Sequence, residues 1–115
     1  MKKVSILALL CLFMASCSSF ITKEHDEQLK TLEAYQYTMR KDVTVEKRSI
    51  AKNKVVKLRT VYGEDYVKVY AYPVSVNTLK AEHVLLIYLF EEDFPDSKFN
   101  FDYVVQRLNE FVVRR

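Results

Sequence analysis

Few residues in this chain have the type and spacing needed for chemistry. The 115 residues include two histidines, His25 and His83, and two cysteines, Cys11 and Cys17. Neither histidine has a second one at metal-ligand spacing, and no Gly-x-Ser-x-Gly elbow is present. The acidic run Glu91–Asp96 lacks the alternating ligands and central glycine of a calcium loop. We therefore expect no enzyme, no metal and no other cofactor.

The single glycine, Gly63, excludes a further class of sites. Loops that bring backbone N–H groups against a phosphate need several residues without a Cβ atom. Mononucleotide- and dinucleotide-binding folds are therefore excluded. The formal net charge of +3 is also too small to indicate nucleic-acid binding by itself.

The N-terminal segment has the organisation of an export signal. Lys2 and Lys3 precede an apolar run, Val4–Ala15, that is broken only by Ser5. A helix of this length covers about 18 Å, against about 30 Å of bilayer hydrocarbon. We therefore expect a cleaved signal and not a permanent span.

The end of this segment, Met14–Cys17, resembles the lipobox of bacterial lipoproteins. The resemblance implies that residues 1–16 are removed and that Cys17 is lipidated. Cys11 is a poor competitor because leucines precede it where small residues are needed. The alternatives are an ordinary signal peptide cut near Ala15 or an uncleaved anchor. Ser18 is similar to outer-membrane sorting patterns, which implies a lipid-anchored protein at the outer membrane, facing the periplasm.

Cleavage at this point would leave the domain without a usable thiol. Cys11 leaves with the signal and Cys17 carries lipid, so catalytic cysteine, disulfide and cysteine–zinc sites are excluded together. Diacylglycerol together with an N-acyl group exceeds the two signals needed for stable anchoring. We expect a signal over residues 1–16, a tether over 17–22 and one domain over 23–115, held on a membrane face.

The first half of the domain has two local patterns. Helix-forming residues over Lys23–Glu33 place His25, Leu29 and Leu32 at helical spacing, which predicts a short helix. From Tyr35 to Val45 apolar and polar residues alternate, with a break at residues 41–42. This alternation predicts a half-buried strand.

The clearest element is a hairpin over Lys54–Tyr72 that turns at Gly63. An even-length loop pairs Leu58 with Ala71, whereas a three-residue loop would mix the two faces. The even register predicts these buried residues: Val56, Leu58, Tyr62, Val67, Val69 and Ala71. It points another set to the opposite face: Lys57, Arg59, Lys68, Tyr70 and Tyr72. Pro73 ends the second strand or places it at an edge.

The remaining residues predict one strand and one helix. After a connection over 77–82, His83–Phe90 is apolar at both parities, which predicts a central strand covered on both faces. A loop follows over Glu91–Ser97. Apolar residues at helical spacing over Phe101–Val112 then predict an amphipathic helix, opened by Ser97 or Asn100, with Arg114 and Arg115 favourable at its end.

These elements predict an α+β fold: a small antiparallel β-sheet or Src-homology-like roll, with a short N-terminal helix and a C-terminal amphipathic helix. The hairpin with its lead-in Ile50–Val55 and its return through Tyr70–Pro73 is similar to the core of small Src-homology-type rolls exported by bacteria. Such rolls bind peptides or cell-wall material. Asn53 departs from this pattern, which usually has a turn glycine.

One surface of the hairpin is a candidate binding face. Six cations and no acid lie within 13 residues: Lys47, Arg48, Lys52, Lys54, Lys57 and Arg59. Lys68 joins them across the hairpin, among Tyr66, Tyr70 and Tyr72. This combination suits a partner protein, an anionic lipid headgroup or an envelope polymer. The alternative is a solvated sheet face balanced by the acidic loop 91–96.

The whole chain also resembles a family of small lipoproteins. The lipobox, the strand Val67–Pro73, the segment Leu85–Phe94 and the terminal helix are together similar to spirochaetal lipoproteins associated with type II secretion. The resemblance implies an accessory or pilotin-like role. We expect a membrane-anchored, non-enzymatic binding module with an envelope protein partner and no nucleic acid. The alternatives are a carrier of a lipid or other apolar ligand and a surface-exposed adhesive lipoprotein.

Overall fold

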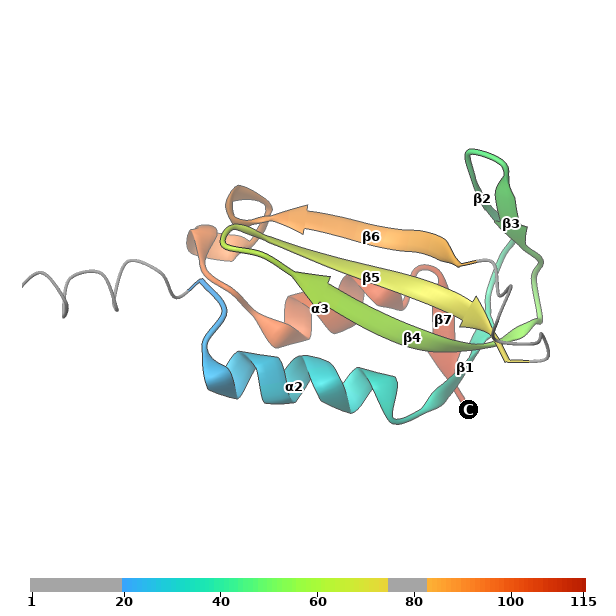
Figure 1. Ribbon diagram of the computed structural model, residues 1–115, viewed down its shortest axis with the longest axis horizontal. Coiled ribbons are helices and arrows are strands. Elements are labelled where there is room, and N and C mark those ends of the chain that lie inside the picture. The colour runs from blue at the N-terminus through green and yellow to red at the C-terminus, as the bar shows by residue number, and fades with distance from the viewer. Residues whose placement is uncertain (1–19, 75–82) are drawn as a thin grey trace, which may run out of the picture.

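The computed structural model describes residues 20–74 and 83–115, and it has the predicted α+β class (Figure 1). A five-stranded antiparallel sheet has the order β6-β5-β4-β1-β7, and two helices lie along one of its faces. Its strands are β1 (Gln36–Met39), β4 (Val55–Tyr62), β5 (Tyr66–Pro73), β6 (Val84–Phe90) and β7 (Val112–Arg114). The helices are α2 (Lys23–Glu33) and α3 (Phe101–Leu108). The sheet is open, so of the two predicted alternatives it is the antiparallel sheet that the structure has.

Helix α2 has the predicted bounds because its first turn is capped. The Thr22 hydroxyl oxygen accepts a hydrogen bond from the His25 backbone N–H at 3.2 Å. The His25 imidazole Nδ1 accepts one from the Thr22 N–H at 3.2 Å. This reciprocal capping box satisfies two donors that a helix start leaves unpaired. Leu29 and Leu32 then pack into the core.

The β4–β5 hairpin has the predicted even register. Leu58 lies opposite Ala71 and Tyr62 lies opposite Val67, and β5 ends at Pro73. The burial prediction holds for every member of the set except Tyr62, which is 40% exposed. Tyr62 lies beside the turn, where its hydroxyl donates to Asp26 Oδ1 at 2.9 Å, so it packs on the polar start of α2 instead of the core.

The prediction of a central strand over 83–90 is wrong, because β6 is an edge strand. Successive residues of β6 are apolar without alternation, for two reasons. A β-bulge shifts the register against β5, so Leu86 and Ile87 are both buried. Tyr88 and Phe90 point to the face without helices and are 41% and 38% exposed.

The predicted strand over 35–45 is two strands in different sheets. β1 ends at Met39, and β2 (Val43–Val45) pairs with β3 (Arg48–Ile50) in a separate hairpin. Glu46 in its turn has a φ of 58°, which lets the chain reverse. Asn53 has a φ of 74°, so asparagine does here what glycine does in the resembled rolls.

The predicted C-terminal helix is too long. α3 begins after the Asn100 cap, whose side chain accepts from the Tyr103 N–H at 3.1 Å, and it ends at Leu108. The chain then turns and adds β7 to the free side of β1, with Val112 opposite Met39. The β-branched pair Val112–Val113 favours this strand, and Arg114 therefore lies in a strand and not at a helix end.

The core lies between the sheet and the helices. It is formed by alternate strand residues and by Leu29, Leu32, Val104 and Leu108, and no buried residue in the described ranges is polar or charged. Phe20 and Ile21, which belong to the predicted tether, pack against this core. The Phe20 ring lies 5.5 Å from that of Phe94, between centroids. The folded part therefore includes residues 20–22.

The predicted loop over 91–97 is a connection made of two short 3-10 turns, η2 (Glu91–Asp93) and η3 (Pro95–Ser97). Three other predictions fall outside the described residues: the signal over 1–16, the lipidation site Cys17 and the connection over 77–82. Among the residues that are described, no helix has both the length and the apolar character needed to cross a membrane.

Candidate functional site

The sheet face that carries no helices brings the predicted binding residues together (Figure 1). Across the β4–β5 ladder, Lys57 lies opposite Tyr72 and Arg59 lies opposite Tyr70. Tyr66 and Lys68 belong to the same parity of β5, which alternates between the two faces. We call this surface the outer face; its residues from β4 and β5 are Lys57, Arg59, Val61, Tyr66, Lys68, Tyr70 and Tyr72.

A first aromatic cluster lies at the end of the outer face nearest the β4–β5 turn. The rings of Tyr88 and Phe90 stack at 4.7 Å, and Tyr66 lies 5.7 Å from Tyr88, between centroids. The Lys68 ammonium lies 4.6 Å from the centroid of Tyr88 and 5.4 Å from that of Tyr66. These cation–π contacts hold a charge above aromatic surface that remains open to solvent.

A second aromatic cluster lies at the start of β6. The His83 ring stacks on Tyr72 at 5.2 Å and meets Tyr70 edge-on at 5.1 Å. Arg48, from β3, donates from Nη1 to His83 Nε2 at 2.9 Å. Since a guanidinium has only donors, Nε2 accepts here. A small pocket of about 210 Å³ opens between this cluster, β2 and the start of β6.

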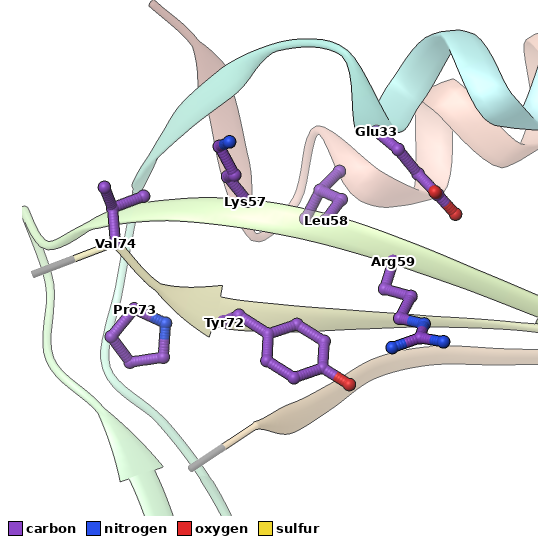
Figure 2. Close-up of a pocket in the computed structure, with 7 residues that line it drawn as sticks. All are labelled: Glu33, Lys57, Leu58, Arg59, Tyr72, Pro73 and Val74. Carbon is purple, nitrogen blue, oxygen red and sulfur yellow. The ribbon is translucent and has the colours of Figure 1, made fainter. Parts of the chain in front are cut away.

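A larger pocket of about 570 Å³ opens beside β4 (Figure 2). Arg59 and Tyr72 extend to the same side of it, so a guanidinium and a phenol hydroxyl are available to a carboxylate or phosphate. Lys57 extends away from them in this view. Glu33 approaches from α2, and its Oε2 accepts from the backbone N–H and hydroxyl of Thr60 at 2.9 and 2.8 Å. Glu33 thereby covers part of the β4 edge.

The charges of the outer face have no carboxylate partners in the described part of the chain. There, ion pairs join only Lys30 to Asp26, within α2, and Arg107 to Glu110, at the end of α3. Arg59 and Lys68 therefore form no ion pair with the acidic run 91–96. Their charge is available to a partner.

The sequence analysis named Arg48 among the cations of the candidate binding face but missed three residues: His83, Tyr88 and Phe90. Tyr88 and Phe90 alternate with buried Leu89, a period-two signal that was masked by the bulged, apolar first half of β6. Arg48 belongs to a strand that was not predicted, and it reaches His83 only through the fold.

The groups with shifted pKa values lie on the helix side of the sheet. The hydrogen bond from Lys30, with a second from Tyr62, lowers the pKa of Asp26, and the same contacts raise the pKa values of Lys30 and Tyr62. Burial raises the pKa of Tyr37, whose hydroxyl donates to the Leu32 carbonyl at 3.0 Å. These groups hold α2 to the sheet through hydrogen bonds and form one ion pair within α2, and they do not identify an acid–base pair for catalysis.

Other site types find little support in the described residues. They contain no group of three or more histidine, cysteine, aspartate or glutamate side chains that could hold a metal ion. His25 is used in the α2 cap and packs on Phe99 at 4.4 Å. The pocket of about 570 Å³ has a mixed lining, in which Glu33, Lys57 and Arg59 lie beside Leu58, Tyr72, Pro73 and Val74.

Comparisons with protein-family models, with curated proteins and with solved structures find no match to this chain.

Proposed function

We propose that this protein is an exported lipoprotein, anchored through Cys17, whose domain binds an envelope protein partner with its outer face. The observation that carries the binding proposal is the pairing of two aromatic clusters, one exposed at Tyr88 and Phe90 and one half-buried around His83, with cations that have no described carboxylate partner. Aromatic residues and arginine are enriched at protein interfaces, because they combine a large apolar contact area with directional polar groups. The role is non-enzymatic, as an accessory of secretion or envelope assembly at the outer membrane.

The anchoring half of the proposal rests on Met14–Cys17 and is tested by labelling. Cells that express the chain should incorporate labelled palmitate into it, and a Cys17→Ser variant should lose the label while Cys11→Ser keeps it. Membrane fractionation of the labelled protein locates it. Label that persists without Cys17 would overturn the assignment.

The binding half is tested by reversing charge on the outer face. We expect Arg59→Glu with Lys68→Glu to abolish partner capture by crosslinking in cells, because both cations flank the aromatic clusters. The matched control is Lys23→Glu with Lys98→Glu, which changes the net charge equally at exposed positions of the helix side. Both variants should unfold at nearly the wild-type urea concentration. Unchanged capture by the outer-face variant would remove this surface as the site.

A further inference from the structure

Among the described residues, the second half of β6 leaves a free sheet edge. Within the described residues β6 pairs only with β5, and its other side has no neighbouring strand. Its seven residues, VLLIYLF, contain no charge and no proline. Edge strands usually contain charged residues or proline, or are very short, and these features prevent pairing with another chain. β7, the opposite edge, follows this rule with three residues that include Arg114.

The side chains along this edge suit a protein neighbour. Tyr88 and Phe90 are 41% and 38% exposed and are stacked on each other, while Leu89 between them is buried. A strand added here would continue the outer face and cover part of both rings. The β2–β3 hairpin approaches the first residues of β6, where Val45 and Arg48 meet Leu85, so the free part of the edge is its second half.

The two ends of β6 carry opposite charge. Glu91, Glu92 and Asp93 follow its last residue, and Asp65 in the β4–β5 turn is held there by a 2.7 Å hydrogen bond from the Glu91 N–H to its carbonyl. His83 and Arg48 lie at the first residue, within 2.9 Å of each other. Antiparallel strands place the start of one against the end of the other. An antiparallel strand fits this edge best when it also has positive charge at its start and negative charge after its end, because each positive end then lies against a negative one.

We infer that β6 pairs antiparallel with the β6 of a second copy of this chain. A two-fold axis near Tyr88 would pair Leu86 of each copy with Phe90 of the other, so that Glu91 follows the paired stretch and approaches the β2–β3 hairpin of the other copy, which carries Arg48. The pairing is isologous and closed, because it uses the β6 edge of both copies, so it does not propagate into fibres. The two outer faces become one continuous surface. This inference does not depend on the proposed partner or on lipidation.

Cysteine crosslinking tests the pairing in the full chain, with Cys11 and Cys17 replaced by serine so that no other thiol is present. In detergent solution, Tyr88→Cys should give a covalent dimer with a short bismaleimide. The matched control is Val61→Cys, which has a similar outer-face exposure, 40% against 41%, but lies on β4, two strands away from the β6 edge. We expect at least tenfold less dimer from the control. Equal yields, or a Tyr88→Cys adduct only with other proteins, would overturn the inference.

Charge exchange tests the orientation of the pair. In the Tyr88→Cys chain, Glu91→Lys and Arg48→Glu should each reduce the dimer yield severalfold. The double variant should restore the dimer yield, because the two positions again carry opposite charges, now exchanged between them. Two reductions without rescue would contradict the antiparallel arrangement.

A third measurement needs no substitution near the edge. Lys68 of the two copies would be separated by three strand spacings, or about 14 Å, which a lysine crosslinker spans. Mixing ¹⁴N- and ¹⁵N-labelled protein identifies crosslinks between copies by mass spectrometry. A mixed-isotope Lys68–Lys68 crosslink is expected, and its absence under conditions that crosslink Lys30 or Lys98 between copies would reject the pairing.

Discussion

The two faces of the five-stranded sheet are built from alternate residues of the same strands, yet their chemistry is opposite. The helix side holds Val56, Leu58, Val67 and Val69, each at most 3% exposed, and has no buried polar residue in the described ranges. The outer face holds tyrosines, arginine and lysine in contact with solvent. Packing accounts for the residues of the first face, whereas nothing in the fold requires the residues of the second. The outer face is therefore where binding is to be sought.

The largest contrast is expected between neighbours on β4. Leu58→Ala removes a buried side chain and should lower the free energy of unfolding by about 2–5 kcal/mol, through lost transfer energy and a cavity. Arg59→Ala, one residue along, should change it by less than about 0.5 kcal/mol. Urea unfolding followed by circular dichroism measures both. Comparable losses would mean that the outer face also supports the fold.

The same contrast between a buried residue and its exposed neighbour is expected on β7. Val112 is 2% exposed and Val113 is 48% exposed, so Val112→Ala should cost about 2 kcal/mol and Val113→Ala much less. The measurement is again the urea midpoint. Equal costs would argue against β7 as a strand with one buried side.

A smaller effect is expected where a polar group enters the helix side. Tyr37→Phe removes the hydrogen bond to the Leu32 carbonyl and should cost about 1 kcal/mol at neutral pH. Because burial raises the folded-state pKa of Tyr37, the unfolded chain loses its proton first as pH rises. The wild type should therefore lose stability above about pH 10, relative to Tyr37→Phe. A constant difference between the two proteins from pH 8 to 11 would contradict this role.

The smallest effect is expected at the margin of the helix side, at Asp26. Its lowered pKa means that the charged form stabilises the folded state at neutral pH. That contribution should disappear as pH falls below about 4, through the folded-state pKa. Asp26→Asn should show a slightly lower thermal midpoint at pH 7 and a shallower decline in acid. If the thermal midpoints of the wild type and Asp26→Asn fall in parallel as the pH is lowered, the Asp26–Lys30 ion pair does not contribute to the stability of the folded state.

Local patterns predicted much of this fold because they depend on neighbours in the chain. The bounds of α2 follow from helix formers and a cap within three residues. The β4–β5 register follows from a short turn and from alternation that only one register keeps on one face. Five of the six predicted face residues follow directly from that register: Lys57, Arg59, Lys68, Tyr70 and Tyr72.

The errors arose where a distant segment decides the outcome. An apolar run such as β6 is compatible with a central strand or an edge, and only the position of other strands decides between them. The apolar spacing of 101–112 fits a helix throughout, but β1 offers a free side that takes Val112–Arg114 as a strand. The second aromatic cluster could not be predicted, since β3, β5 and the start of β6 meet only in space.

By itself the sequence determined the α+β class, the hairpin and its two chemically distinct faces, because turn length and alternation act over a few residues. The single glycine also marks the turn of this hairpin, where Gly63 adjoins the Tyr66 ring so closely that a Cβ atom there would overlap it. Only the tertiary structure decided which strand is left at the edge and which aromatic residues join the cations. Strand order depends on which long-range pairings bury the most apolar surface, and that is a property of the whole chain.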